Sequence, residues 1–337
     1  MKFYQYHSLK KYNTFGLDVY AKYFVDYSSK DELSDILNQE VVHKNPLLVV
    51  GQGSNLLFLS DFEGVVIHSV LKGITLIEES EDSVVLEVGS GVVWDDLVEH
   101  CVQHGWHGIE NLSLIPGEVG ASAIQNIGAY GVEIKDVLQK VKAVRIADGK
   151  TKIFDREACH YGYRQSVFKK ELKGQYIILS IVIKLSKIPV FHLTYHHLEK
   201  EVLSRGEINL RHVRDTIIAI RESKLPNPEE IGNAGSFFMN PIVNRKKFED
   251  LRSAYPKMPH YFISETEEKI SAAWLIDQCG WKGKRVGNAG VYAHQALVLV
   301  NYGNATGQEI ADLAYQIQAD VDAKFGIKLI PEVNFIS

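Results

Sequence analysis

The chain has 337 residues, of which 45% are hydrophobic, so it is long enough for two or three domains with sizeable cores. A formal net charge of -5 and the lack of a long Lys/Arg block argue against general nucleic-acid binding, which depends on clustered basic residues. Three widely spaced cysteines argue against a disulfide framework, and no signal-sequence core or membrane-length apolar run is visible, so we expect a cytoplasmic protein that does not insert into a membrane.

The first part of the chain combines short helices and strands. Residues 29–39 open with Ser-Lys-Asp-Glu, a capping-box pattern that predicts a helix. The apolar run 47–50 stops at a glycine and predicts a buried strand, and the run 84–88 predicts another. Apolar residues at helical spacing follow over 94–104.

Strand signals continue toward the middle of the chain. Residues 141–146 alternate and meet Ala-Asp-Gly-Lys, a turn sequence typical of hairpins. Ile and Leu at every second position over 176–185 predict a strand buried on one face. The polar, histidine-rich segment 186–207 is expected to be an excursion from the fold. This mixed order is not the regular strand–helix alternation of a doubly wound parallel sheet.

A second αβ region follows a predicted boundary. The helix expected over 213–222 is ended by Leu-Pro-Asn-Pro, whose prolines indicate a domain boundary. The remaining predicted elements are a helix at 271–279, a strand at 296–300, a capped helix at 306–325 and a closing strand at 327–335. Gly326 is the expected C-cap of the long helix, and Pro331 indicates an edge or strand-end position for the last strand.

Two segments are rich in glycine and small residues. Val-Val-Gly-Gln-Gly-Ser-Asn at 49–55 can aim backbone N–H groups at a phosphate, although it matches neither a Rossmann nor a Walker pattern, and a tight structural turn is equally possible. The run 115–131 has few side chains that would stop a large flat ligand from approaching the backbone. Ordering such a run without a partner costs entropy, but a plain irregular loop remains the alternative.

Three single residues are further candidates. Arg164 lies among aromatic residues and can clamp a carboxylate or merely stack on a tyrosine at the surface. Ser236 lies between a glycine-rich approach and two phenylalanines, which suits a hydroxyl at the wall of a dry pocket or an ordinary buried serine. The Gly-x-Ser-x-Gly elbow of serine nucleophiles is absent. Glu332, in an apolar strand, needs a partner or a raised proton affinity unless it is a surface residue.

The histidines and cysteines do not form a recognisable site. His192, His196 and His197 lie close together but lack the companion spacing of a zinc site, so we predict a solvated loop and no metal. Cys159 and His160 are adjacent, which does not define a catalytic pair without tertiary information.

Five segments in one order resemble the UDP-N-acetylenolpyruvoylglucosamine reductase family of bacterial peptidoglycan precursor synthesis. They are Gly-Gln-Gly-Ser-Asn-Leu-Leu-Phe at 51–58, Ile-Pro-Gly-x-Val-Gly-Ala-Ser at 115–122 with Gln-Asn-Ile-Gly-Ala-Tyr-Gly at 125–131, Tyr-Arg-x-Ser-x-Phe at 163–168, Gly-Asn-Ala-Gly-Ser-Phe-Phe at 232–238 and Pro-Glu-Val at 331–333. Each is weak alone, but the five in register are specific, and they cover nearly the whole chain.

The resemblance implies an α+β fold. It predicts an FAD-binding domain of the vanillyl-alcohol-oxidase type with two α+β subdomains, followed by a C-terminal α+β substrate-binding domain. The implied ranges are 1–68 and 69–225 for the subdomains, the latter with the 186–207 excursion, and 226–326 for the substrate-binding domain. The strand at 327–337 is expected to return to the first subdomain. The implied protein is a cytoplasmic monomer that serves cell-wall biogenesis, cell shape and cell division.

The resemblance also implies a reaction, the reduction of UDP-N-acetylglucosamine enolpyruvate to UDP-N-acetylmuramate. NADPH reduces FAD, and flavin N5 then gives a hydride to the enolpyruvyl methylene carbon. Arg164 and Glu332 stabilise the enolate-like intermediate, and Ser236 protonates the neighbouring carbon. Neutral serine is a poor acid in water, so this role needs a strongly basic centre in a water-poor site, from which Phe237 and Phe238 are expected to help exclude water.

The remaining site residues are carried over by position. The implied cofactor-binding residues are Gly51, Gln52, Gly53, Ser54, Asn55, Pro116, Gly117, Gly120, Ala121, Ser122, Asn126, Gly128, Ala129, Tyr130 and Gly131, and the implied substrate-binding residues are Tyr195, Lys224, Asn233 and Gln295. Tyr195 matches the mobile loop of the family's longer subtype. Two departures are Gln165, where the family commonly has an acid, and Met239, where many relatives have a lysine.

Two other functions remain open at this point. One is a different flavin oxidoreductase on the same scaffold, acting on an alcohol or a sugar. The other is a non-catalytic protein that binds a nucleotide or a UDP-sugar. Flavin content separates the second from the enzymes, and substrate-dependent oxidation of NADPH separates the first.

Overall fold

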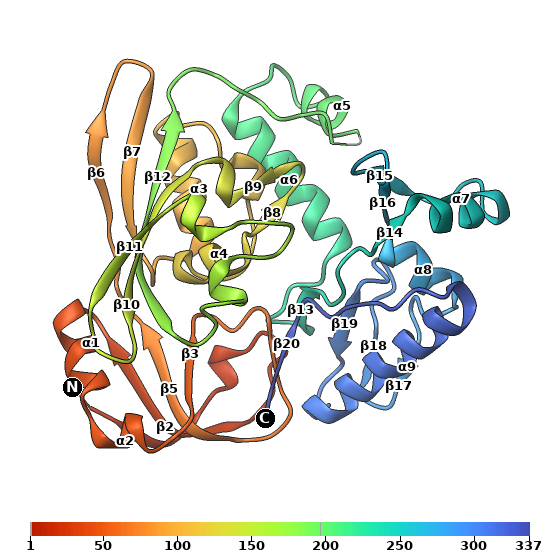
Figure 1. The fold of residues 1–337 in the computed structure, drawn as a ribbon. Helices are drawn as coiled ribbons and strands as arrows, with labels where there is room; N and C mark the ends of the chain where they lie inside the picture. The colour runs from red at the N-terminus through yellow and green to blue at the C-terminus, as the bar shows by residue number, and fades with distance from the viewer. Residues whose placement is uncertain (1, 196) are drawn as a thin grey trace. The chain divides into compact units, whose positions relative to one another are not determined.

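The computed structural model describes residues 2–195 and 197–337, which form two compact units interleaved along the chain (Figure 1). The first unit consists of Met1–His7, Ala21–Gln52 and Glu63–Arg221. The second consists of Ser8–Tyr20, Gly53–Phe62 and Glu222–Ser337. Among the described residues, no helix combines the length and the apolar character needed to cross a bilayer.

An antiparallel sheet of five strands forms the centre of the first unit (Figure 1). Its order is β11 (Thr151–Asp155), β10 (Leu138–Arg145), β12 (Tyr176–Ser186), β7 (Ser83–Gly89) and β6 (Ile74–Glu79). The hairpin predicted from Ala-Asp-Gly-Lys joins β10 to β11, with the Arg145 N–H donating to the Lys150 carbonyl at 2.9 Å. This part of the sequence prediction is confirmed.

The prediction that β12 is buried on one face only is wrong. Ile177 and Leu179 belong to one apolar core, whereas Ile181 and Ile183 belong to another. The register against β10 explains the change, because Leu179 is an extra residue where β12 bulges. A bulge moves the side chains beyond it to the opposite face of the sheet. Both faces of β12 are therefore buried.

A second sheet of the first unit lies in the N-terminal part of the chain. Its order is β1 (Tyr4–Ser8), β2 (Tyr20–Tyr27), β5 (Phe62–Ser69) and β3 (Leu47–Val50), accompanied by the helices α1 (Lys30–Leu37) and α2 (Glu40–His43). Ser29 caps α1, because its Oγ accepts the Glu32 N–H at 3.1 Å. The Glu32 carboxylate accepts from Ser28 rather than from Ser29, so the reciprocal half of the predicted box is shifted by one residue.

Helices and short strands complete the first unit. They are α3 (Trp94–Gln103), α4 (Val119–Gln125), β8 (Gly128–Ala129), β9 (Val132–Glu133), α5 (Leu198–Leu203) and α6 (Leu210–Lys224). The 186–207 segment is more than a polar excursion, since Leu193, Leu198 and Val202 pack with Val213 and Ile217 in a small apolar cluster. This cluster attaches the segment to α6.

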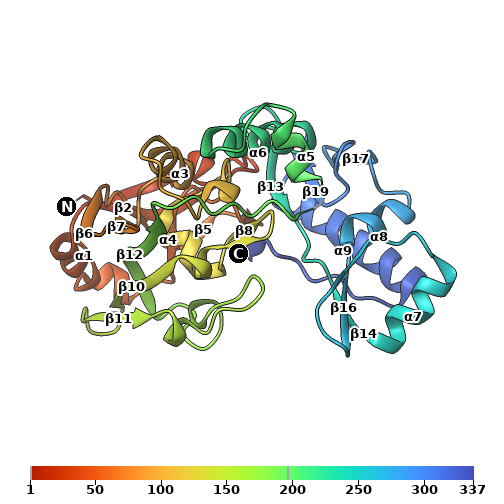
Figure 2. The same ribbon diagram turned by 90° about the horizontal axis from the view of Figure 1, so that it is seen from above.

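The second unit contains two small antiparallel sheets (Figure 2). One has the order β13 (Gly232–Ser236), β19 (Val298–Asn301), β18 (Ala289–Val291), β17 (Arg285–Val286), and the other β14 (Ile242–Asn244), β16 (Glu267–Ile270), β15 (His260–Phe262). Its helices are α7 (Arg245–Ala254), α8 (Ala272–Gln278) and α9 (Gly307–Phe325), of which α9 lies against β18 and β19. Both predicted ends of α9 are confirmed, with a Thr306–Glu309 capping box and Gly326 at φ 59°.

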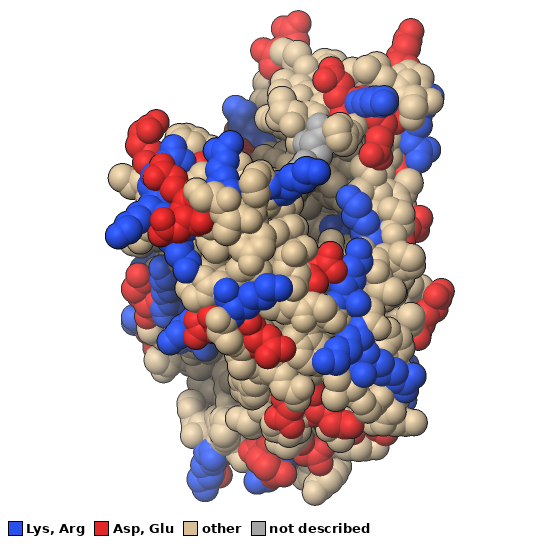
Figure 3. Space-filling model, turned by 90° about the vertical axis from the view of Figure 1, so that its right-hand side faces the viewer, with Lys and Arg blue, Asp and Glu red and all other residues tan. Residues whose placement is uncertain are grey.

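The C-terminal strand is shorter than predicted. β20 (Asn334–Ile336) pairs in parallel with β4 (Leu56–Phe58), whereas 327–333 is not part of a regular strand. Pro331 meets Phe238 only as an isolated bridge, because proline has no N–H to donate to a ladder. On the face shown in Figure 3, acidic and basic side chains both occur, as the small net charge leads one to expect.

Candidate active site

The two glycine-rich segments meet within the first unit. The Gly117 N–H donates to the Gln52 Oε1 at 2.9 Å. A Cβ added at Gly51 would lie 3.0 Å from the Glu118 Oε2, so the first loop runs directly over the second. The end of β3 and the start of α4 therefore hold both predicted cofactor segments in contact.

Gly53, which follows Gln52 in the first loop, has to be a glycine for two reasons. Its φ is +65°, and an added Cβ would lie 1.8 Å from the Tyr12 carbonyl oxygen. The Thr14 N–H also donates to the Gly53 carbonyl at 3.4 Å. The tight-turn interpretation of this loop is thus physically correct, and it leaves room for anion binding by the same backbone.

Left-handed backbone is frequent in the second segment and near Arg164. Leu114, Asn126 and Tyr130 have φ of 57°, 53° and 48°, and Arg164 has 55°. Each such residue costs roughly 1–2 kcal/mol, and strain of this kind gathers at functional sites. The cost has to be offset by surrounding contacts, so the loop shape is specified rather than incidental.

Two arginines of α6 fix the residue that precedes this segment. The Leu114 N–H donates to the Asp95 Oδ1 at 2.5 Å, and its carbonyl accepts from the Arg221 Nε at 3.2 Å. Asp95 is itself held by the buried Arg214, whose Nη1 and Nη2 donate to it at 2.7 and 2.8 Å. Charged residues on two helices were the only sequence signal for this network.

Some residues of the 115–131 segment are buried and support the loop, whereas others are exposed at its surface. The side chain of Ser122 is buried and donates to the Val119 carbonyl at 2.7 Å. Asn126 is fully buried, and its amide donates to the Gly162 carbonyl and the Glu133 carboxylate at 3.0 and 2.9 Å. Both were predicted as cofactor-binding residues, and their side chains shape the loop from inside.

The exposed members of this segment fit a flat, uncharged ring. Pro116, Ala121 and Gly131 are exposed, and Gly128 to Tyr130 are half-buried. None of them carries a charge, and most have almost no side chain, so a large aromatic system can approach the backbone. The FAD contacts that the resemblance implies for this loop stay a prediction.

Arg164 is fastened to the same loop. Its Nη2 donates to the Gly128 carbonyl at 2.5 Å, and its Nη1 lies 3.8 Å from the Glu133 Oε1. The guanidinium also lies 5.3 Å from the centre of the Tyr163 ring, so the stacking expected for a surface arginine occurs as well. The side chain is mostly buried, at 18% exposure, and is held by polar contacts.

Ser236 stands exposed at the end of β13, where the strand bulges against β19. The turn before it is shaped by Asn233, whose Oδ1 accepts the Gly235 N–H at 2.9 Å and whose amide donates to the carbonyls of Pro226 and Ile231. Asn233 is only 2% exposed and holds the turn, and its predicted contact with the substrate stays a prediction. Its effect on a substrate would pass through Ser236.

Backbone hydrogen bonds bring three predicted site residues together in the second unit. The Phe237 N–H donates to the Leu297 carbonyl at 2.8 Å, which places Ser236 next to the turn that contains Gln295. The Glu332 N–H donates to the Phe237 carbonyl at 2.8 Å. The Glu332 carbonyl in turn accepts from the amide of Asn55, at 3.1 Å.

Phe237 and Phe238 are buried next to Ser236, and their expected part in excluding water stays a prediction. They are 0% and 1% exposed, and the Phe237 ring lies 6.3 Å from that of Phe15 and 5.9 Å from that of Phe335. Both rings are core residues of the second unit. They anchor the end of β13. The exposed hydroxyl of Ser236 needs further groups to shield it from water.

The other predicted substrate residues lie at the surface. Lys224 is the exposed last residue of α6. The Tyr195 ring meets that of Tyr130 edge-on, with centroids 5.6 Å apart. The amide of Asn111, a buried residue that sequence reasoning missed, donates to the carbonyls of Tyr130 and His192 at 2.9 and 2.7 Å. Asn111 therefore fastens the 186–207 segment to the second glycine-rich segment.

The histidines and cysteines suggest no metal or thiol chemistry. Within 2–195 and 197–337, no group of three or more His, Cys, Asp and Glu is arranged to hold a metal ion. His192 and His197 belong to this range, whereas His196 lies outside the described residues. Burial raises the pKa of the Cys159 thiol to about 11, so the thiolate that reacts with electrophiles is scarce near neutral pH.

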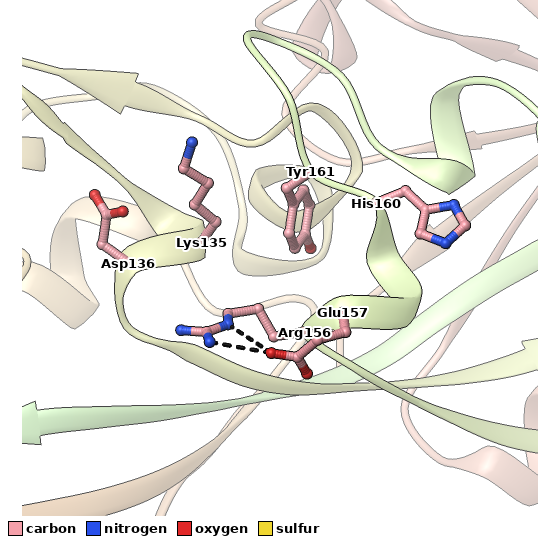
Figure 4. A pocket seen from close by; sticks show the side chains of 6 residues that line it. All are labelled: Lys135, Asp136, Arg156, Glu157, His160 and Tyr161. Carbon is pink, nitrogen blue, oxygen red and sulfur yellow. Dashed lines mark hydrogen bonds and ion pairs between the residues drawn. The ribbon is translucent and has the colours of Figure 1, made fainter.

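A surface hollow of about 580 Å³ is lined by none of the predicted site residues (Figure 4). It is lined by Lys135, Asp136, Arg156, Glu157, His160 and Tyr161. Arg156 is paired with Glu157 at 3.0 Å, and acids and bases alternate around the hollow. This balance of charge does not favour an anionic nucleotide.

Comparison with known proteins agrees with these features. Residues 21–155 match the family model described as FAD binding domain, and 227–336 match the C-terminal domain of UDP-N-acetylenolpyruvoylglucosamine reductase. The UDP-N-acetylenolpyruvoylglucosamine reductase of Bacteroides fragilis is 51% identical over 332 residues, 98% of this chain and 99% of the relative. That of Pseudomonas aeruginosa is 44% identical over 329 residues, 97% of each chain.

Solved structures support the fold. UDP-N-acetylenolpyruvylglucosamine reductase from Thermus caldophilus superposes with a TM-score of 0.70 at 23% identity, covering 100% of this chain and 98% of that one. For 6-hydroxy-D-nicotine oxidase from Arthrobacter nicotinovorans the TM-score is 0.52 at 12% identity, covering 91% and 81%. The predicted α+β fold, an FAD-binding domain of the vanillyl-alcohol-oxidase type followed by an α+β domain, is confirmed. The chain is an FAD-dependent oxidoreductase and belongs to the UDP-N-acetylenolpyruvoylglucosamine reductase family.

Proposed function

We propose that the chain reduces UDP-N-acetylglucosamine enolpyruvate to UDP-N-acetylmuramate, with NADPH as the electron source, FAD as the bound carrier and Ser236 as the proton donor. The observation that carries the proposal is the meeting of Ser236, Gln295 and Glu332 through the backbone of the second unit. The family supplies the substrate class, and the exposed hydroxyl at the end of β13 supplies an acid that a ligand can reach.

In the proposed reaction the protein residues and the cofactor have different tasks. FAD bound at the glycine-rich segments would, when reduced, supply the hydride that the methylene carbon of the enolpyruvyl group accepts. The electron pair of the double bond moves toward the carbon that bears the carboxylate, and the Ser236 hydroxyl gives its proton to that carbon. The serine then recovers a proton from solvent. Hydride and proton together saturate the double bond.

Glu332 and Arg164 act on the charge that develops. An ionised carboxylate would repel the enolate-like intermediate, so Glu332 assists only in its protonated form, as a hydrogen-bond donor beside Ser236. Arg164 is always cationic and is already oriented by the Gly128 carbonyl. Fixed cations of this kind act without reorganisation when charge appears in the transition state.

Water exclusion is proposed to come from the 186–207 segment. Ser236 is exposed, so its hydroxyl is a competent acid only when substrate and protein cover it. We assign that cover to Tyr195, Lys224 and Gln295 around the substrate, with Asn233 acting through the turn before Ser236. Met239 in place of a lysine leaves one positive charge fewer for the nucleotide, and Gln165 leaves the Arg164 contacts intact.

The proposed organisation follows the chain. It has FAD-binding subdomains at 1–68 and 69–225 and a substrate-binding domain at 226–326, with 327–337 returning to the first subdomain. β20 pairs with β4, which lies within 1–68 in sequence but belongs with 222–337 in the second unit. The two glycine-rich segments and their neighbours, including Gly120 and Ala129, are the proposed FAD contacts. A cytoplasmic monomer completes the proposal.

The test follows NADPH absorbance with and without the enolpyruvyl UDP-sugar. We expect oxidation that depends on this substrate and a purified protein that is yellow or becomes so with FAD. Turnover that ignores the substrate would favour another flavin oxidoreductase. A colourless protein that cannot be loaded with FAD would contradict the assignment of the glycine-rich segments.

A further inference from the structure

A histidine lies between two carboxylates beneath the glycine-rich loops. His68, at the end of β5, places its Nδ1 2.7 Å from the Asp26 Oδ1 and its Nε2 3.2 Å from the Glu118 Oε1. The His68 side chain is 12% exposed and that of Glu118 is 7% exposed, whereas Asp26 is 39% exposed. All three belong to the first unit.

This geometry selects one protonation state of the imidazole. Ionised carboxylates only accept hydrogen bonds, so both contacts are satisfied together when both ring nitrogens carry a proton. Burial lowers the pKa of His68, but hydrogen bonds and charge from Glu118 and Asp26 outweigh burial and raise it above the usual value. The imidazolium is therefore favoured near neutral pH.

Glu118 is the member of this group that faces the proposed cofactor site. It occupies the open position of the Ile-Pro-Gly-x-Val-Gly-Ala-Ser motif. Its other carboxylate oxygen lies 3.0 Å from where a Gly51 Cβ would be, and the preceding Gly117 N–H donates to the Gln52 side chain. A negative charge directly under both loops would oppose the binding of a diphosphate.

We propose that His68 is a positioning residue for FAD, which as a cation neutralises Glu118 and holds it folded back beneath Gly51 so that the glycine-rich loops can accept the cofactor's diphosphate. The inference rests on the proposed role of these loops. It adds to that role the claim that cofactor affinity depends on the charge of a residue that does not touch the cofactor.

The neighbours of His68 on β1 and β2 include a carboxylate, a phenol and aromatic rings. From β2, Asp26 contributes a second negative charge, and the Tyr27 hydroxyl lies nearby, its pKa raised by burial and by the charge of Glu118. The Phe24 ring lies 6.3 Å from the imidazole, with His7 of β1 stacked on Phe24 at 4.3 Å. None of these neighbours is a lysine or an arginine. Loss of the His68 proton leaves two carboxylates beside the loops.

The sign of the pH dependence follows from the raised pKa. Below that pKa the imidazolium is present and FAD affinity is full. As pH rises through it, the positive charge is lost, the Glu118 carboxylate is no longer neutralised, and FAD binding weakens, by an expected factor of about ten. A structural role without charge would produce no such dependence.

The experiment measures the FAD dissociation constant of the flavin-stripped protein by quenching of flavin fluorescence, from about pH 5.5 to about pH 9. Three variants are compared with the wild type: His68→Gln, Glu118→Gln and the double variant. We expect His68→Gln to bind FAD about tenfold more weakly even at low pH, and Glu118→Gln to bind tightly without pH dependence. The double variant should regain tight binding, because the charge that needed neutralising is gone.

Each result is decisive. Wild-type-like pH dependence in Glu118→Gln, or failure of the double variant to regain affinity while thermal unfolding shows it folded, would overturn the inference. A wild type that binds FAD with a constant affinity at all pH values would also overturn it but leave the proposed function standing. A folded wild type that binds no FAD at any pH would instead refute the proposed role of the loops.

Discussion

Arg164 and Ser236, which are both proposed to act on the enolate-like intermediate, are held in place in different ways. The side chain of Arg164 is tied to the Gly128 carbonyl and lies near Glu133, so its long, flexible stem is immobilised by contacts at the tip. Ser236 has one rotatable side-chain bond, and its position is set by the backbone of β13. A long side chain needs anchors at its charged end, whereas a short one needs only a rigid main chain.

Because of this difference, the two residues are sensitive to substitutions at different places. Arg164 depends on the shape of a strained loop, because Asn126 and Gly128 supply the carbonyls around it. Ser236 depends on residues that it never touches through its side chain, namely Asn233 in the turn and the buried Phe237. Substitutions that separate the side chain from its support can therefore test the comparison.

The largest effect is expected for Ser236→Ala. Removing the proton donor should slow substrate reduction by about 10²–10⁴-fold and leave flavin reduction by NADPH nearly intact. Stopped-flow flavin absorbance measures the two half-reactions separately. Ser236→Cys, which keeps a transferable proton at the same position although a thiol is a weaker hydrogen-bond donor, should recover part of the rate. Equal losses in both half-reactions would mean that Ser236 supports folding or binding instead.

The next largest effect is expected for Arg164→Lys. Lysine keeps the charge but cannot reproduce the planar fork that contacts the loop carbonyl, so we expect about 10²-fold lower kcat/KM for the UDP-sugar. Arg156→Lys is the matched control, since Arg156 is an exposed arginine paired with Glu157. If both variants behave alike, the anchoring of Arg164 has no catalytic importance.

Asn233→Ala tests the backbone support of Ser236. The change leaves the carbonyls of Pro226 and Ile231 without their amide donor, and we expect a loss of about 1–3 kcal/mol in the free energy of unfolding. Substrate reduction should also slow by about tenfold, because the turn that presents Ser236 loosens. Urea unfolding and single-turnover kinetics measure the two effects. An unchanged rate in a destabilised variant would show that Asn233 does not position Ser236.

Asn111→Ala should have the smallest effect. The side chain joins the carbonyls of Tyr130 and His192, so its loss should free the 186–207 segment and raise KM for the UDP-sugar about threefold to tenfold, with less change in kcat. Faster proteolysis within 186–207 would report the same loosening. Wild-type KM together with wild-type proteolysis would show that other contacts hold the segment.

Local signals in the sequence were reliable, and long-range ones were not. Both ends of α9 could be predicted because Thr306, Glu309 and Gly326 act within one turn of the helix. The two-sided burial of β12 could not, because it depends on a bulge at Leu179 against a strand far away in sequence. The extent of the last strand failed for a similar reason, since 327–333 lies against the Phe238 region instead of a ladder partner.

The same distinction between local and long-range information applies to the candidate site. The order of the motifs led to the prediction of Ser236, Arg164 and Glu332 as catalytic residues, which stays a prediction. It could not show that Asn233 and Asn126 are buried, or that Phe237 belongs to a core, because burial depends on what packs around a residue. Supports such as Asn111 and His68 have no sequence signature, since their partners come from separate segments of the chain.

The interleaving of the two units has a consequence for synthesis on the ribosome. Residues 8–20 and 53–62 emerge early but belong with the segment from 222 onward, and β4 meets its partner β20 only when the last residues have been made. Until then its edge is unpaired and open to association with other chains. Neither unit can be produced as an uninterrupted fragment, so truncation at 222 should give an aggregating product rather than a smaller folded protein.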